Sequence, residues 1–181
     1  MTWGFDPNDK EAAKVFYVKD KELFETDFPS DLDEKFIVPE KAIDFECEKS
    51  LPAFEEYSDT IDSDADWDEY DEQVALFGVD PAVEADQCFK LLGYANIIQN
   101  SILEECEAVS RGIDCGEPLD LPRKVQKDIY EKSKDWILLA QFGTISEELM
   151  FGDCGCLYIY IRKQDLKNLD FSKIHFSLQC G

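Results

Sequence analysis

Trp136-Ile-Leu-Leu-Ala-Gln-Phe142 and Leu157-Tyr-Ile-Tyr-Ile161 are the two stretches that decide the fold of this 181-residue chain. Each is a nearly continuous apolar and aromatic run of strand length, a pattern typical of strands buried inside a sheet. The turn-forming string Phe151-Gly-Asp-Cys-Gly155 stands a few residues before the second run. The two runs are therefore predicted to pair as an antiparallel hairpin.

Further strands are predicted on both sides of this hairpin. Residues 13–18 are β-branched and aromatic, and residues 42–48 and 173–180 alternate between apolar and polar side chains. In the last of these, Ile174, Phe176 and Leu178 are expected to face inward, and His175, Ser177 and Gln179 outward. Val125 to Lys134 fits a short amphipathic helix. The prediction is an α+β fold, mostly antiparallel sheet with a few helices, in a single domain over residues 1–181.

Sequence similarity between two segments of the chain suggests a duplicated strand-rich unit. Residues 15–28 align without gaps on residues 158–171, each with a strand, then charged residues, an acid-Leu pair and Asp-Phe. Because the acid-Leu pair and the Asp-Phe pair both match at the same offset, a repeat is favoured over chance. We therefore expect two copies of one supersecondary unit, the first of them truncated.

The acidic segment, residues 55–86, is the strongest charge feature. Residues 50–89 contain no Lys or Arg and 13 acidic residues. Trp67, Tyr70, Val74 and Phe77 follow one another at helical spacings of 3, 4 and 3, which predicts an amphipathic helix ending near Phe77-Gly78. The candidate partner-binding residues of this segment are Asp62, Asp64, Asp66, Trp67 and Tyr70.

Charge and composition exclude several classes of function. The net charge of −23 and the pI near 4.2 argue against nucleic acid and anionic lipid as partners, because both require clustered Lys and Arg. No apolar run has the length of a membrane span, and the N-terminus does not resemble a signal peptide. Seven cysteines, an odd number, favour reduced thiols, so the expected location is the cytoplasm.

Catalytic and cofactor motifs are missing from the sequence. The single histidine, His175, is predicted to face outward, and no nucleophile elbow or glycine-rich phosphate loop is present. An enzyme is therefore not favoured, and no cofactor is expected.

A few polar residues remain as candidates for ligand binding. Asp153 lies between glycines in the Gly152–Gly155 turn, where it either closes the turn or faces a ligand. Gln99 and Gln141 interrupt apolar stretches, so as buried amides they either pin the structure together or contact a ligand. Cys154, Cys156 and Cys180 are weak zinc candidates, since a Cys-x-Cys pair lacks the spacing of a zinc knuckle.

The order of several motifs resembles the YwqG-like family, a bacterial domain of unknown function. The resemblance rests on Trp3-Gly-Phe-Asp-Pro7, Leu91-Leu-Gly-Tyr94 with Gln99, Glu105-Cys-Glu-Ala-Val-Ser-Arg-Gly-Ile-Asp-Cys-Gly116, Asp135-Trp-Ile-Leu-Leu-Ala-Gln141, Phe151-Gly-Asp-Cys-Gly-Cys-Leu-Tyr-Ile-Tyr-Ile161 and Leu178-Gln-Cys180. It covers the C-terminal two-thirds of the family, whose N-terminal strand motifs are absent here. Cys156 and His175 stand where members of the family tend to have Arg and an aromatic residue. The resemblance implies an α+β fold around an antiparallel sheet and implies no reaction.

The leading functional hypothesis is a non-enzymatic module, of immunity or interaction type, that binds a basic protein through its acidic surface. The alternative is a small-ligand-binding or hydrolase-like domain with its site near the Gly152–Gly155 turn.

Overall fold

A four-stranded antiparallel sheet with the order β1-β2-β3-β4 lies at the centre of the molecule. The computed structural model describes residues 2–19, 24, 26–34, 37–38, 40–61, 64–78, 88–116, 120–144 and 149–181. The strands are β1 (Phe89–Leu91), β2 (Trp136–Phe142), β3 (Cys156–Arg162) and β4 (His175–Gln179). The hairpin expected from the two apolar runs is confirmed as the pair β2 and β3, and the α+β class is confirmed as well.

A register shift in β2 decides which side chains share the core face. Leu138 pairs with Tyr160, but the register shifts between Leu138 and Ala140, so that Gln141 stands opposite Tyr158. An extra residue in one strand turns the following side chains over. Gln141 is thereby brought to the same face of the sheet as Leu138.

The core lies between this face and helix α3 (Leu103–Ser110), which packs on β2 and β4. Helix α4 (Arg123–Ser133) packs on α3, and α5 (Lys163–Lys167) packs on β3. The principal buried cluster is Ala95, Ile102, Leu103, Cys106, Trp136, Leu138, Cys156, Tyr158 and Tyr160. The predicted helix near Val125 is confirmed as α4.

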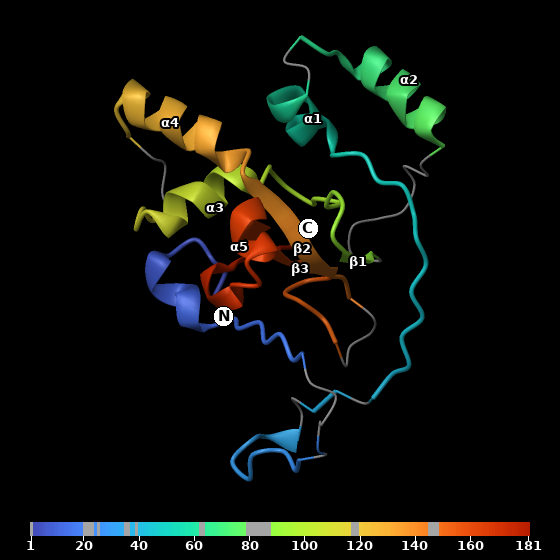
Figure 1. The fold of residues 1–181 in the computed structure, drawn as a ribbon, viewed down its shortest axis with the longest axis vertical. Coiled ribbons are helices and arrows are strands. Elements are labelled where there is room, and N and C mark those ends of the chain that lie inside the picture. The colour runs from blue at the N-terminus through green and yellow to red at the C-terminus, as the bar shows by residue number, and fades with distance from the viewer. Residues whose placement is uncertain are drawn as a thin grey trace.

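Two further helices pair with each other beside the sheet. Figure 1 shows α1 (Phe54–Thr60) and α2 (Trp67–Phe77) beside each other at the top of the molecule. The sequence-predicted helix is confirmed as α2, and Gly78 ends it in the left-handed conformation with φ +65°, which glycine adopts without strain. Of the helices in the described ranges, none has the length and apolar character needed to cross a bilayer.

The strands predicted at 13–18 and 42–48 are wrong. Both stretches lack assigned strand, and Phe16, Ile43 and Phe45 are largely exposed. Alternation and β-branching favour an extended backbone, but a strand also needs a neighbouring edge to bond with. Residues 158–171 form β3 and α5, whereas the described residues of 15–28 contain neither a strand nor a helix. The predicted repeat therefore does not extend to structure.

The inward and outward assignment of β4 is also wrong. The strand is buried on both faces: Phe176 and Leu178 on one side, His175, Ser177 and Gln179 on the other. Its polar side chains lie on the face that α3 covers, where His175 Nε2 contacts Glu105 Oε1 at 2.9 Å. The N-terminal residues run along its outer edge, since Leu178 N donates to Trp3 O at 3.0 Å.

Candidate functional site

Four aromatic rings form a cluster between α1 and α2, and we call Phe54, Tyr57, Trp67 and Tyr70 the aromatic cluster. Trp67 stacks on Phe54 with ring centroids 4.0 Å apart. Tyr70 meets Phe54, Tyr57 and Trp67 edge-on at 5.5 to 5.9 Å. Stacked and edge-to-face pairs are the arrangements that aromatic quadrupoles prefer. The cluster therefore holds the two helices together.

Local hydrogen bonds fix where α2 begins and how it sits. Asp66 caps the helix, accepting from Glu69 N at 2.9 Å through its carboxylate. Tyr70 Oη donates to Pro52 O at 2.9 Å and so ties α2 to the segment before α1. These contacts set the orientation of the rings relative to the capping carboxylate.

The surface of this helix pair is both acidic and aromatic. Trp67 remains 57% exposed, and the side chains of Asp68, Glu69, Asp71 and Glu72 are exposed on the same helix. Burial, followed by the nearby charges of Glu55 and Asp71, raises the pKa of Tyr70, so its phenol stays protonated at neutral pH. We call α1, α2 and these side chains the acidic hairpin.

The predicted residues of the acidic segment separate into different roles. Trp67 and Tyr70 belong to the aromatic cluster, and Asp66 is the helix cap. Asp64 is exposed in the turn before the helix. Asp62 lies outside the described residues. The structure thus brings three of the five predicted residues to the start of α2.

Gln99 and Gln141 bond to the backbone. Gln141 is 1% exposed; its Oε1 accepts from Asn96 N at 3.0 Å, and its Nε2 donates to Asn96 O at 3.2 Å. Gln179, which the sequence reasoning did not single out, accepts from Ile98 N and donates to Asn100 O. Gln99 Nε2 donates to Cys180 O at 2.8 Å. These amides clamp the loop over residues 95–100 onto the sheet, which is the structural one of the two predicted roles.

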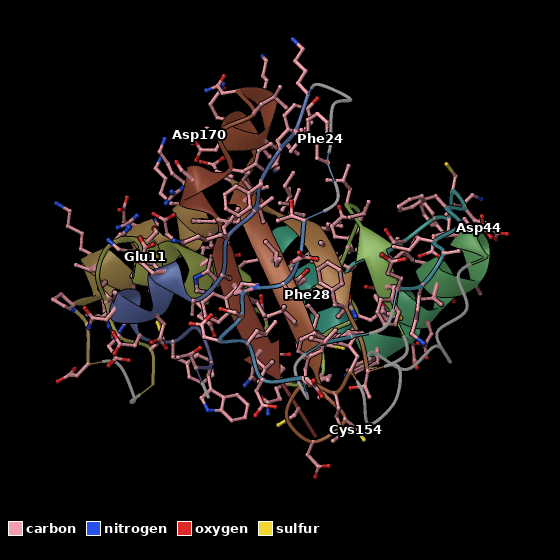
Figure 2. All side chains as sticks on the ribbon, turned by 90° about the horizontal axis from the view of Figure 1, so that it is seen from below. Glu11, Phe24, Phe28, Asp44, Cys154 and Asp170 are labelled. Atoms are coloured by element: carbon pink, nitrogen blue, oxygen red, sulfur yellow. The ribbon has the colours of Figure 1, made fainter. Side chains whose placement is uncertain are left out.

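The Gly152–Gly155 turn is closed by its own backbone. Gly155 N donates to Phe151 O at 2.7 Å, and Gly152 adopts φ +64°. Asp153 is exposed, and Figure 2 shows the neighbouring Cys154 at the margin of the molecule. The two cavities described below are lined by other residues. A ligand site at this turn stays an untested prediction.

The three predicted metal candidates differ in their surroundings. Cys154 is exposed, Cys156 is fully buried, and Cys180 lies beside Gly152. Cys156 Sγ accepts a long 3.8 Å contact from the buried amide Nε2 of Gln141. Within the ranges that the structure describes, no group of three or more His, Cys, Asp or Glu side chains is placed to hold a metal ion.

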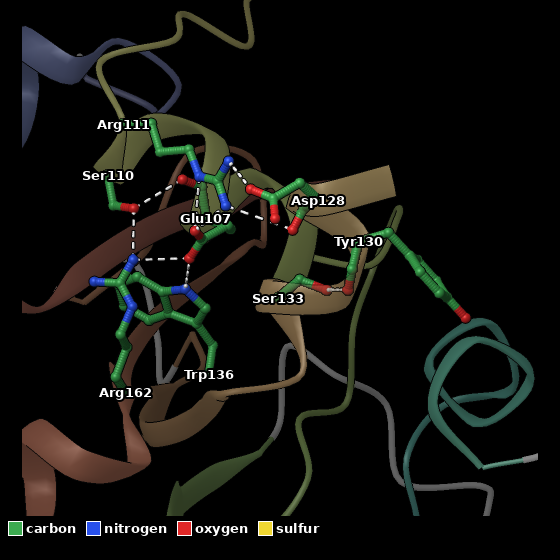
Figure 3. Close-up of polar contacts among 8 residues, drawn as sticks. All are labelled: Glu107, Ser110, Arg111, Asp128, Tyr130, Ser133, Trp136 and Arg162. Atoms are coloured by element: carbon green, nitrogen blue, oxygen red, sulfur yellow. Dashed lines mark hydrogen bonds and ion pairs between the residues drawn. The ribbon is translucent and has the colours of Figure 1, made fainter. Parts of the chain in front are cut away.

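A buried carboxylate that sequence reasoning missed organises the polar centre of the molecule. Figure 3 shows Glu107 of α3 between Arg111, Arg162 and Trp136. Its Oε2 accepts from Arg162 Nη2 at 2.7 Å and from Trp136 Nε1 at 3.0 Å, while Oε1 accepts from Arg111 Nε at 2.8 Å. Burial opposes ionisation of Glu107, but the bonds from Trp136, Arg162 and Arg111 outweigh it and lower its pKa. The i, i+4 spacing of Glu107 and Arg111 is the one sequence signal that points here.

Two cavities flank this centre. The larger, about 970 Å³, lies between the N-terminal segment, β4 and η4 (Phe171–Lys173), and Arg162 and Trp136 line it. The smaller, about 460 Å³, has Glu56, Tyr160 and Lys163 on its walls. Glu56 is the inward-facing acid of α1, with its Oε1 3.5 Å from Tyr160 Oη.

Comparison with known proteins gives a family and no activity. A family model described as a domain of unknown function, DUF1963, matches residues 1–180. No curated protein matches the chain significantly.

Proposed function

Because the chain belongs to the DUF1963 family, for which no activity is described, we propose its function from the geometry of the site: it is a non-enzymatic module that binds a basic protein through the acidic hairpin. The proposal commits to a partner whose contact surface is rich in Arg and Lys.

The main support for the proposal is that the Trp67 ring is exposed and yet held in a fixed position. Its ring is 57% exposed, yet it is held against Phe54 at 4.0 Å. A rigid, exposed tryptophan costs little conformational entropy when a partner covers it, and Trp and Tyr are enriched among the residues that dominate binding energy. The aromatic cluster therefore supports an anchor for a docking partner.

Charge supports the choice of a basic partner. The exposed carboxylates of α2 surround the anchor, and residues 50–89 contain no Lys or Arg. A field of one sign speeds the encounter with an oppositely charged protein. An Arg side chain can also lie over the face of Trp67 while it bonds to a neighbouring carboxylate. An immunity-type inhibitor that covers a basic toxin or nuclease is one form of this function.

The experiment compares capture of partners by two variants of the same helix. Trp67→Ala removes the anchor, whereas Leu76→Ala removes another exposed apolar side chain of α2 outside the aromatic cluster. Each protein is used to capture binders from the native lysate at about 20 mM and about 300 mM salt, and the bound proteins are identified by mass spectrometry. The recovered partner is then purified, and its affinity for each variant is measured by calorimetry.

We expect a basic protein that binds at low salt and is released at high salt. Trp67→Ala should weaken its affinity at least about tenfold, and Leu76→Ala should leave it within about twofold. Binding that ignores salt, or that survives Trp67→Ala unchanged, would overturn the proposal. Circular dichroism of both variants confirms that the fold is retained.

We also propose a subfamily and a cellular location for the protein. The ordered motifs support a place among the YwqG-like members of the family. None of the seven cysteines, all of them in the described ranges, forms a disulfide, and this supports a cytoplasmic setting, where thiols stay reduced.

A further inference from the structure

Arg162 presents unused hydrogen-bond donors to the larger cavity. Its bonds to described residues both leave from Nη2, to Glu107 Oε2 at 2.7 Å and to Ser110 Oγ at 2.8 Å. The guanidinium group has five N–H donors in a fixed planar fork. Nη1 therefore has no acceptor among the described residues, and Figure 3 shows dashed lines to only one nitrogen of Arg162.

The fork is held rigidly in place. Its carbon lies 4.4 Å from the centroid of the Trp136 ring, over the face of the indole. Glu107, which bonds Nη2, is itself fixed by Trp136 Nε1 and Arg111. A guanidinium that is already oriented loses little entropy when it binds a second oxyanion.

The cavity around this fork differs in charge from the rest of the chain. Lys10, Lys14, Lys173 and Arg162 line it against the acidic side chains of Asp6, Glu11 and Asp170; Lys14 pairs with Glu11, and Lys173 pairs with Asp165 and Asp170. Figure 2 labels Glu11 and Asp170, which both line the cavity. The lining thus holds four cationic and three acidic side chains, in a protein whose net charge is −23. Among these cations, Arg162 has in Nη1 a donor group that no described residue occupies, and an anion can bind there.

The remaining walls are apolar. Trp136, Phe171 and Phe176 contribute aromatic surface, and the cavity of about 970 Å³ is large enough for a small organic molecule. Pockets of this size that combine apolar walls with a few fixed polar groups are typical ligand sites.

We propose that this cavity binds a small organic anion, one oxygen of whose carboxylate or phosphate group accepts from Nη1 of Arg162 and whose apolar body lies against Phe171 and Phe176. This site is separate from the acidic hairpin and does not depend on a protein partner.

The test uses phenylacetate and phenyl phosphate as probes and benzyl alcohol as the uncharged control. The full chain, labelled with ¹⁵N, is titrated with each probe, and the indole N–H signal of Trp136 and the backbone signals of 170–176 are followed by NMR. Nuclear Overhauser contacts from the ring protons of the probe to Phe176 locate it. A preference for phenylacetate identifies a carboxylate ligand, and a preference for phenyl phosphate identifies a phosphate ligand; either supports the site.

Two variants distinguish the loss of the Arg162 guanidinium from a loss of stability around Glu107. Arg162→Gln removes the fork, while Arg111→Gln removes the other arginine bound to Glu107 and does not line the cavity. We expect Arg162→Gln to weaken probe binding at least about tenfold and Arg111→Gln to leave it within about twofold. Arg162→Lys keeps the charge but not the fork, and serves if Arg162→Gln does not fold.

Several results would overturn the proposal. These are no shift with either anion at millimolar concentration, binding of benzyl alcohol as tight as that of the anions, or equal effects of the two arginine variants. Probe contacts to α1 and α2 in place of Phe176 would likewise reject this cavity without touching the function proposed for the acidic hairpin.

Discussion

Trp136 donates from Nε1 to the buried carboxylate of Glu107 at 3.0 Å, across 29 residues of sequence. The same oxygen accepts from Arg162, and the other oxygen accepts from Arg111, so α3, β2 and β3 meet at one side chain. Glu107 therefore joins the helix layer to the sheet.

Replacing Glu107 with Gln should lower the free energy of unfolding by about 3 kcal/mol, because two arginines lose the charge that they share in a buried setting. Asp128→Asn is the matched control: it also removes a carboxylate from Arg111, but its side chain is 59% exposed, so a loss below about 1 kcal/mol is expected. Urea denaturation measures both. Equal losses would contradict the central role of Glu107.

The contribution of Glu107 to stability should depend on pH. Its pKa is lowered in the folded protein, so its contribution is fully present above the unfolded value of about 4.3 and is lost as the pH falls through the lower folded value. The stability difference between wild type and Glu107→Gln should be largest near pH 7 and should shrink below about pH 4. Urea midpoints at several pH values test this, and a gap that is constant with pH would disprove it.

Gln141→Ala should destabilise the protein by about 2 kcal/mol, since it removes a fully buried amide that accepts from Asn96 N and donates to Asn96 O. Gln99→Ala loses one exposed bond to Cys180 O and should cost less than about 1 kcal/mol. Hydrogen exchange at the amide of Asn96 should accelerate only in the first variant. An unchanged rate there would argue against the amide clamp.

Two glycine replacements separate crowding from backbone conformation. A Cβ on Gly155 would stand 2.3 Å from Gln179 O and 2.5 Å from Phe151 O, whereas a Cβ on Gly78 would meet nothing within 4 Å. Gly155→Ala should cost at least about 2 kcal/mol through overpacking, and Gly78→Ala about 1 kcal/mol through its positive φ alone. Thermal unfolding of the two variants provides the comparison. A larger loss at Gly78 would reverse this ranking of the two causes.

Thiol alkylation should follow burial. Cys47 and Cys154 are exposed and should react first, while burial raises the pKa of Cys115 to about 11 and should slow it. Burial, then the charges of Glu105 and Glu56, also raises the pKa of Cys106, whose side chain is fully buried, so its thiol should react only in denaturant. Mass spectrometry of digests, with a urea-unfolded sample as the control, checks the order. Early labelling of Cys106 would show that the core opens.

The elements that the sequence predicted correctly are those whose signal is local. The apolar runs around residues 136–142 and 157–161 and the stripe from Trp67 to Phe77 carry their period and their turn signals within a few residues. The short β1 was not predicted, because three residues contain too little pattern to recognise. Trp67 and Tyr70 were singled out for the same local reason, as they share one helix face.

Tertiary structure alone decided the rest. Alternation at 13–18 and 42–48 favours an extended backbone, but only the arrangement of the sheet determines whether an edge is there to pair with. The alternation in β4 indicates that its two faces differ in polarity. It does not indicate that α3 covers the polar face. The partners of Glu107 lie as far as 55 residues away, so apart from the i, i+4 spacing of Glu107 and Arg111 no pattern along the chain indicates the polar centre or the cavity beside Arg162. The sequence by itself determined the local elements and the acidic character, because those depend on neighbours in the chain; the sites depend on neighbours in space.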